Sequence, residues 1–245
     1  FRWNYLEEQD SSALPGFTKF LQGGGRAKFT NPLFPTLSYP TWTTLSTGQY
    51  AETHGIVGNY FYDPQTEEVF SLFDKESTGK QKVYEQVSKI PGVTAYKHSD
   101  IPERFHYKNN KYIHDIILLA DQGHFIMASK SEKQLPLRNN YVYIGAHGYD
   151  PDLQDMKGIF FAKGPAFKCG WTIDPIHIVD IYQVLSHVLG VAPQPHNGTW
   201  ERVREIFTSD GSHTLYTAPS HTSPLQISFL LSSVVLIMFC VTYYK

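Results

Sequence analysis

The sequence predicts an α/β domain in which a central sheet carries helices on both faces. Short apolar runs of strand length alternate along the chain with longer amphipathic segments of helical period. Glycine-rich and polar stretches such as Gln22–Arg26 separate these segments and are typical of loops. The expected strands are Ala27–Phe29, Ile116–Ala120 and Ile159–Lys163, and the expected helices are Gly16–Leu21, Thr41–Tyr50 and Pro175–Leu189.

The helix expected from Thr41 to Tyr50 begins directly after Pro40, whose missing N–H is no loss at a helix start. Ser38 stands just before it. The free N–H groups and the positive end of such a helix would favour an anion beside Ser38. Serine also caps helices for purely structural reasons, so this feature alone leaves both interpretations open.

The last expected helix has a clear start and stop in the sequence. Asp174 is the predicted N-cap, Pro175 fits the first turn, and Gly190 fits the residue after the last turn. Apolar residues recur along it at helical spacing, which predicts packing against the core: Ile176, Val179, Leu185 and Val188.

Composition excludes few functions. The 245 residues could form one sizeable domain or part of a larger one. With 21 Lys and Arg against 23 Asp and Glu, the chain lacks the basic balance expected of a nucleic-acid partner. Aromatic residues make up 15%, which suits either a quaternary ammonium cage or an ordinary aromatic core.

A series of motifs surrounds Ser38: Phe34-Pro-Thr-Leu-Ser-Tyr-Pro40, Thr47-Gly48, His54-Gly55, Asn59 and Tyr62-Asp-Pro64. Together they resemble the ectonucleotide pyrophosphatase/phosphodiesterase family of the alkaline phosphatase superfamily. The resemblance implies that Ser38 is the catalytic nucleophile and contacts both metal and substrate, and that Asn59 holds a phosphate oxygen. Serine in place of threonine is most similar to the choline-specific glycerophosphodiester phosphodiesterase.

A second set of motifs carries the same resemblance in the other half of the chain. Gly145-Ala-His-Gly-Tyr-Asp150, followed by Asp155-Met-Lys-Gly158 and the run to Phe167, is similar to the family's last metal-binding segment. This implies that His147 is a zinc ligand and lines the substrate site; neutral imidazole is a suitable zinc donor. The resemblance covers residues 1–207 and implies an alkaline-phosphatase-like central sheet, here incomplete.

The family holds two zinc ions, and the resemblance implies that most of their ligands are missing here. The first aspartate would precede Phe1, so we expect a truncated N-terminus. The Asp and His ligands of the middle would fall in a segment that is absent between Tyr84 and Pro91. Asp121-Gln-Gly-His124 looks like a substitute pair, but its spacing after an apolar strand predicts a structural turn.

Three functions follow as alternatives. The first is hydrolysis of choline phosphodiesters, such as glycerophosphocholine or lysophosphatidylcholine, by a two-zinc serine mechanism. The alternatives are a nucleotide pyrophosphatase/phosphodiesterase of the same family and a non-catalytic, membrane-anchored binding form; an unfolded splicing product is the remaining explanation. Because Ser38, Asn59 and His147 cannot hold two zinc ions, we expect this chain to be inactive as given and, with its middle excised, marginally stable.

The C-terminal part predicts a cell-surface protein. Residues 208–224 form a polar stalk, and residues 225–245 form an apolar tail near the minimum length for a spanning helix. Small residues, a polar spacer and an apolar end predict a GPI signal with attachment near Ser209; a single-pass helix is the alternative. Asn197-Gly-Thr is a glycosylation acceptor, Cys169 is left unpaired, and a homodimer stays open.

Overall fold

The computed structural model describes residues 1–8, 10–63, 65–66, 68–71, 89–126, 137–138, 141–142, 145–208 and 235–239. Its largest sheet has four strands in the order β10-β1-β9-β12: Thr172–Ile173, Gly24–Ala27, Ile159–Lys163 and Val235–Phe239. Strand β1 runs parallel to β10 and antiparallel to β9, and β12 runs antiparallel to β9. The predicted attachment residue Ser209 and most of the predicted stalk lie outside the described residues.

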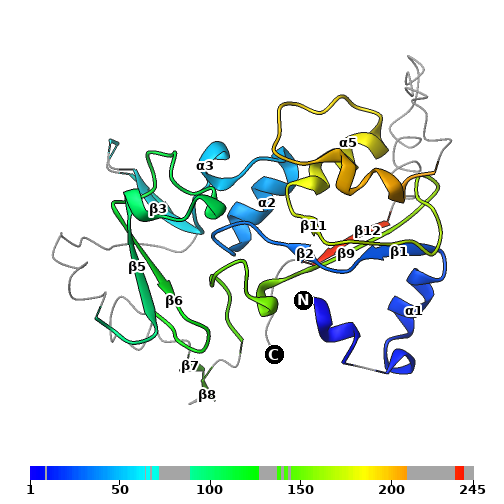
Figure 1. The fold of residues 1–245 in the computed structure, drawn as a ribbon, viewed down its shortest axis with the longest axis horizontal. Coiled ribbons are helices and arrows are strands. Elements are labelled where there is room, and N and C mark those ends of the chain that lie inside the picture. The colour runs from blue at the N-terminus through cyan, green and yellow to red at the C-terminus, as the bar shows by residue number, and fades with distance from the viewer. Residues whose placement is uncertain are drawn as a thin grey trace.

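Helices cover both faces of this sheet, which confirms the predicted α/β class. Figure 1 shows α5 (Asp180–Leu189) on one side of the sheet and α1 (Pro15–Leu21) on the other. The α1 rings of Phe17 and Phe20 approach the ring of Phe161 in β9, with centroids 5.8 and 6.4 Å apart. Aromatic packing therefore joins the first helix to the middle of the sheet.

Strand β9 matches its predicted bounds and forms the centre of the core. Its first four residues, Ile159 to Ala162, are all at most 6% exposed. A continuous buried run is typical of a strand covered on both faces, because successive side chains point to opposite sides. Next to it, a Cβ on Gly25 would lie 2.3 Å from the Trp171 ring, so only glycine lets the indole lie on β1.

A separate two-stranded sheet corrects two predicted elements. Strands β2 (Thr30–Asn31) and β11 (Ile176–His177) pair in parallel, so the predicted strand 27–29 is replaced by β1 and β2. The predicted helix 175–189 is wrong over its first five residues, because Ile176 N–H donates to Phe29 O and Ile178 N–H donates to Asn31 O. These bonds commit the backbone to a strand.

Helix α5 consequently begins at Asp180, and Asp174 is not its cap. The Asp180 carboxylate accepts the N–H groups of His177 and Thr199, both at 2.8 Å, and forms a bidentate ion pair with Arg202 at 2.7 Å. Asp174 instead lies exposed and pairs with Lys28. The first residue of the helix is therefore a buried, fully bonded carboxylate that a sequence window cannot distinguish from an ordinary helical Asp.

The helix predicted from Thr41 to Tyr50 is divided in two. Helix α2 spans Ser38–Thr47 and α3 spans Ala51–His54. Gly48 separates them with a left-handed φ of 68°, and its N–H closes α2 onto Thr44 O at 2.7 Å. A positive φ is a glycine conformation, so the chain turns there instead of continuing the helix.

Hairpins lie beside the main body: β3 (Tyr60–Asp63) with β4 (Glu68–Ser71), β5 (Val93–Lys97) with β6 (Ile116–Ala120), and β7 (Leu137–Arg138) with β8 (Tyr141–Val142). Strand β6 has its predicted bounds. Asp121 to His124 form the predicted structural turn, because His124 N–H donates to Asp121 O at 3.0 Å. Short 3-10 helices span Trp3–Leu6, Ser11–Ala13, His98–Asp100, Glu103–Phe105, Gln154–Met156, Trp200–Arg202 and Arg204–Ile206.

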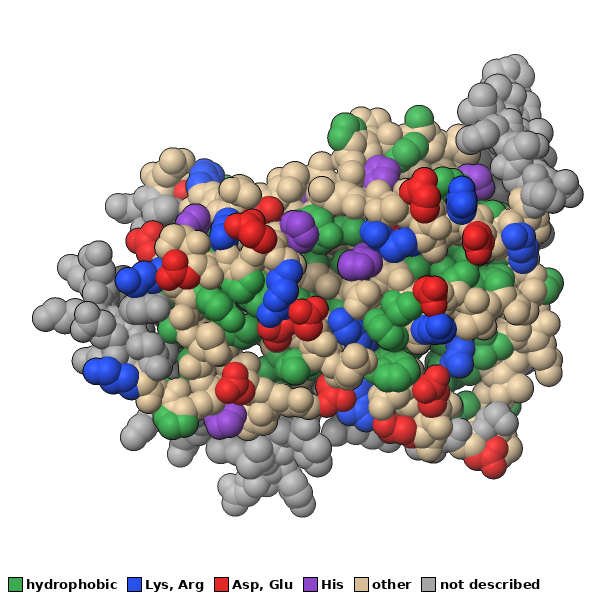
Figure 2. All heavy atoms as spheres, in the orientation of Figure 1, with side chains coloured by type: hydrophobic (Ala, Val, Ile, Leu, Met, Phe, Trp, Pro, Cys, Tyr) green, Lys and Arg blue, Asp and Glu red, His purple; other side chains and the backbone are tan. Residues whose placement is uncertain are grey.

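The surface exposes several apolar side chains. Figure 2 shows apolar side chains along the middle of one face, between groups of both charges. Trp42 is 47% exposed and Tyr60 is 43% exposed. In the part of the chain that the structure describes, no helix is both long and apolar enough to cross a membrane.

Candidate functional site

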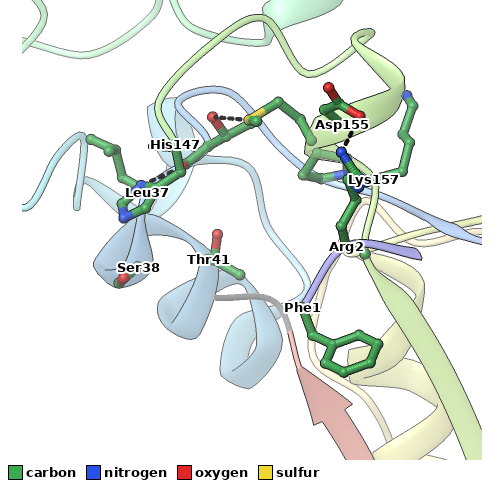
Figure 3. A pocket seen from close by; sticks show the side chains of 12 residues that line it. Phe1, Arg2, Leu37, Ser38, Thr41, His147, Asp155 and Lys157 are labelled. Atoms are coloured by element: carbon green, nitrogen blue, oxygen red, sulfur yellow. Dashed lines mark hydrogen bonds and ion pairs between the residues drawn. The ribbon is translucent and has the colours of Figure 1, made fainter. Parts of the chain in front are cut away.

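A small pocket lies where the start of α2 meets the loop 145–158 and the first residues of the chain. Its volume is about 60 Å³, and its lining includes Arg2, Ser38, His147, Asp155 and Lys157. Figure 3 shows that these side chains come from three separate segments. The fold therefore brings Ser38 and His147 to one pocket, although more than a hundred residues separate them in the sequence.

Ser38 is half-buried and is the first residue of α2, so it does not precede the helix as the sequence predicted. Most N–H groups of the first turn of α2 are not available to a ligand. Tyr39 N–H donates to Asn59 Oδ1 at 2.9 Å, Pro40 has no N–H, and Thr41 N–H donates to Leu37 O at 3.2 Å. The helix end therefore offers an anion fewer donors than the sequence indicated.

Asn59 lies beside Ser38 because its side chain bonds the next backbone amide. The atom that accepts from Tyr39 N–H must be the oxygen, since an amide nitrogen cannot accept. This bond fixes the orientation of the amide and leaves Nδ2, which carries two donors, on its other side. Asn59 is thus held in place while its donor group stays available to an incoming oxygen.

The imidazole of His147 is oriented by a backbone carbonyl. Its Nδ1 lies 3.1 Å from Thr36 O, and a carbonyl can only accept. Nδ1 therefore carries a proton, and in the neutral form of the ring Nε2 keeps its lone pair. This is the tautomer that a metal ligand or a hydrogen-bond acceptor would need.

Thr36 connects the two halves of the pocket, and the sequence analysis missed it. Besides the carbonyl contact to His147, its hydroxyl accepts Gly148 N–H and donates to Tyr149 O, both at 2.9 Å. Thr36 is only 9% exposed, and Gly148 reaches it with φ of 99°. The available signal was a threonine two residues before Ser38, inside the motif Phe34–Pro40, but its partners lie more than a hundred residues away.

The other side of the pocket carries charged groups that are already paired. Asp155 accepts from Arg2 Nη1 at 2.9 Å and from the side-chain amide of Gln122. Arg2 also pairs with Glu8 at 3.1 Å. The buried ammonium of Lys157 donates to Asn31 Oδ1 at 2.7 Å and to Pro151 O at 2.8 Å, and burial lowers the pKa of this amine.

The donors in this pocket do not fit a pair of zinc ions. Among the residues that the structure describes, no three His, Cys, Asp or Glu side chains converge as a metal site would require. His147 and Ser38 supply two donors, whereas structural zinc takes four ligands and catalytic zinc takes three from protein. The Asp155 carboxylate is held by Arg2 and Gln122, so it is not a free third ligand.

Aromatic side chains follow Ser38 on α2, with Tyr39 half-buried and Trp42 exposed. The rings of Tyr39 and Trp42 meet edge to face, with centroids 5.0 Å apart. Tyr60 follows Asn59 directly and is also exposed. Such rings can stack on a planar base or attract a quaternary ammonium group.

His54 fixes α2 against α3 behind the site. Its Nδ1 accepts Ile56 N–H at 3.1 Å, and its Nε2 lies 3.1 Å from Thr44 Oγ1. Because a backbone N–H can only donate, Nδ1 is unprotonated and the ring is neutral in this arrangement. Burial lowers the pKa of His54, in agreement with that state.

The remaining predicted positions lie apart from the pocket. Asn197 is exposed, and its Oδ1 accepts Tyr50 N–H at 3.3 Å. Cys169 is exposed and is a free cysteine. Glycosylation at Asn197 stays a prediction.

A known protein family matches more than half of this chain. Residues 1–98 and 75–150 match the family model described as type I phosphodiesterase / nucleotide pyrophosphatase. The two matched pieces overlap at residues 75–98, the region where the sequence predicts the missing segment.

Curated relatives match part of the chain. Human ectonucleotide pyrophosphatase/phosphodiesterase family member 5 is 39% identical over 143 residues, which are 58% of this chain and 28% of the relative. The bovine bis(5'-adenosyl)-triphosphatase ENPP4 is 41% identical over 122 residues, which are 49% of this chain and 25% of the relative. The chain therefore spans between a quarter and a third of the length of these relatives.

Solved structures share the fold. Human ENPP5 matches with a TM-score of 0.73 at 22% identity, over 85% of this chain and 97% of that chain. An inactive murine ENPP5 variant in complex with AMP matches with a TM-score of 0.71 at 20% identity, over the same shares of the two chains. At 20–22% sequence identity, these structural matches establish the fold alone.

Proposed function

The chain belongs to the type I phosphodiesterase / nucleotide pyrophosphatase family, and from this premise we propose that its Ser38 pocket binds the phosphate group of a nucleotide ester. In this proposal Ser38 is the nucleophile toward phosphorus, and Asn59 Nδ2 donates to a non-bridging oxygen. The observation that carries the proposal is the bond from Tyr39 N–H to Asn59 Oδ1, which holds the amide beside Ser38 while Nδ2 has no hydrogen bond to a residue that the structure describes.

The chemistry of the pocket favours an anionic ester over a neutral one. An Asn donor aimed at a phosphate oxygen stabilises charge that grows during displacement, an effect often worth about 3 kcal/mol. Arg2 and Lys157 line the same pocket and offset its carboxylate. The AMP bound to an inactive relative of the same fold supports a nucleotide as the first ligand to test.

Zinc would supply the activation of the serine hydroxyl in this family, but the donors of this chain do not fit it. We therefore propose binding and slow covalent capture, without efficient turnover. Attack of Ser38 Oγ on an activated diester would form the Oγ–P bond and break the bond to the leaving group. With bis(p-nitrophenyl) phosphate, the leaving electron pair goes to p-nitrophenolate and the hydroxyl proton goes to water.

A choline phosphodiester is the second candidate ligand. Ser38 in place of threonine motivates it, and the edge-to-face pair of half-buried Tyr39 and exposed Trp42 could attract a quaternary ammonium group. The same rings would stack on a nucleobase, so competition decides between the two ligands. We expect AMP to displace a fluorescent nucleotide at lower concentration than phosphocholine; the reverse order would favour the choline ester.

The experiment measures AMP binding by calorimetry and phosphoryl adducts on the protein by mass spectrometry. Ser38→Ala should abolish the adduct from bis(p-nitrophenyl) phosphate. Asn59→Asp keeps the oxygen that Tyr39 N–H needs but loses the donor, so AMP affinity should fall roughly tenfold or more. Ser46→Ala is the matched control, because Ser46 lies exposed on the same helix.

An adduct that persists in Ser38→Ala, or AMP affinity that both Asn59→Asp and Ser46→Ala leave unchanged, would contradict the proposal.

Location at the cell surface through a GPI signal or a spanning tail is a separate proposal, and surface labelling of cells with and without phospholipase treatment tests it.

A further inference from the structure

Strand β9 needs hydrogen-bond partners along both of its edges. Its residues 159–162 are buried, so water cannot satisfy an unpaired N–H or carbonyl there. On one edge, β1 pairs with β9 at only three positions, from Gly24 opposite Lys163 to Arg26 opposite Phe161. A buried backbone group without a partner costs roughly 1–3 kcal/mol.

The other edge is paired along its whole length by a segment from the C-terminal part of the chain. Strand β12 runs antiparallel to β9 in a five-residue register, from Val235 opposite Lys163 to Phe239 opposite Ile159. Figure 1 shows β12, in red, alongside β9 beneath α5. This pairing is longer than that of β1, so most of the ladder on β9 comes from β12.

We infer that the segment Val235–Phe239 has two mutually exclusive states, one as the edge strand that the structure pairs with β9 and one as part of the predicted apolar membrane tail. An open central strand is a template for pairing with another chain, and a covering strand removes that hazard. Strand addition gains affinity from main-chain hydrogen bonds, so it requires an apolar, extended segment more than a particular sequence. Residues 235–239 read Val-Leu-Ile-Met-Phe and meet that requirement.

Chain length permits this pairing within one molecule. Residues 209–234 connect the end of the main body to β12, and a chain of that length reaches about 85 Å when extended. The same five residues lie inside the apolar run that the sequence predicts as a membrane anchor or a GPI signal. Their N–H groups cannot serve a helix and the β9 ladder together, so the two states exclude each other.

Disulfide trapping tests the register in the full chain. In a Cys169→Ser and Cys240→Ser background, Val235→Cys is combined with Lys163→Cys, its partner across the ladder. Paired antiparallel residues lie about 4.5–5.5 Å apart at Cα, within disulfide range. The matched control combines Phe239→Cys with Lys163→Cys, which the register separates by four residues, about 13 Å along the strand.

The inference predicts a disulfide within one chain for the first pair, formed at least about tenfold faster than in the control. Equal rates in the two pairs, or disulfides only between two chains, would overturn it. In the fraction of protein that co-sediments with phospholipid vesicles, disulfide formation in the first pair should be slower, because the segment has left β9 for the bilayer. An unchanged rate in that fraction, or no co-sedimentation, would overturn the two-state inference.

A second measurement needs no cysteine. Adjacent residues of a strand point their N–H groups in opposite directions, so only one of Ile237 and Met238 donates to β9. Proline removes the N–H of its own residue, so one of the variants Ile237→Pro and Met238→Pro loses a bond to β9 and the other serves as its control. One of them should speed amide exchange in residues 159–163 more than the other. Exchange that neither proline changes would contradict the pairing.

Discussion

The two sides of the Ser38 pocket satisfy their polar groups in opposite ways. On the nucleophile side, backbone groups hold Asn59 and His147, and Thr36 holds the loop after His147. Among the described residues, Asn59 Nδ2 and His147 Nε2 have no hydrogen-bond partner. On the carboxylate side, Arg2 and Gln122 take up Asp155. The nucleophile side is thus organised by hydrogen bonds within the chain, and the carboxylate side is paired with side chains of the chain itself.

This difference explains how the Ser38 pocket can keep its arrangement although the described residues do not assemble a metal site. A free carboxylate beside a phosphate pocket would repel the ligand and would carry a desolvation cost. Its pairing with Arg2 reduces both effects. The comparison predicts that damage to the nucleophile side has large consequences, whereas changes to the carboxylate side and metal removal have small ones.

The largest effect is expected from Thr36→Val. The variant keeps the volume of the side chain but leaves Gly148 N–H and Tyr149 O without their partner, which should lower the free energy of unfolding by about 2–4 kcal/mol. AMP affinity should fall as well, because the loop that carries His147 loses its support. Urea unfolding and calorimetry measure the two effects, and Thr53→Val on exposed α3 is the control. Equal results for both variants would remove Thr36 from the comparison.

A smaller effect is expected from acidification through His54. Its pKa in the folded state lies below the ordinary value of 6.5, chiefly because of burial. The unfolded chain therefore binds a proton first as the pH falls, and stability declines below pH 6.5 until the folded pKa is passed. His54→Gln should reduce this decline between neutral and mildly acidic pH. An unchanged slope in urea unfolding would show that other groups cause it.

A still smaller effect is expected from Asp155→Asn. The Asp155 and Arg2 side chains are 36% and 27% exposed, so the pair should contribute only about 0.5–1 kcal/mol. Removing one negative charge from the pocket should tighten AMP binding by roughly threefold. A weaker affinity would mean that Asp155 supports the ligand and that the two sides do not differ as described.

The smallest effect is expected from metal removal. Because the described residues do not assemble a zinc site, chelator treatment should leave both the unfolding midpoint and AMP affinity unchanged. Metal analysis of the purified chain should find well under one zinc per molecule. Two zinc ions per chain, with loss of binding after chelation, would overturn the assignment of both sides.

Parts of the fold and site were readable from local patterns. Strands at residues 116–120 and 159–163 have their predicted bounds, because a short apolar run with flanking turn residues leaves few alternatives. The motifs also led to Ser38 and His147, and the structure places both at one pocket. Whether they act as nucleophile and ligand stays a prediction.

Other parts were not readable. Asp174-Pro175 has the form of a helix start, yet β2 captures Ile176 as a strand and delays the helix to Asp180. Helix α2 ends at Thr47, because Gly48 turns the chain there; the apolar pattern had predicted that the helix continues to Tyr50. The role of Thr36 could not be predicted, because its hydroxyl bonds the distant residues Gly148 and Tyr149.

The sequence by itself determined the α/β class, the short buried strands and the family to which the chain belongs. These depend on residue types at close spacing, and propensity and periodicity act over a few residues. The tertiary structure alone decided that Thr36 holds the loop after His147 and that Asp180 starts the last helix. It also decided that Asp155 is neutralised by Arg2. Each of these depends on a hydrogen bond or ion pair to a distant segment or to a backbone group that only the fold brings into reach.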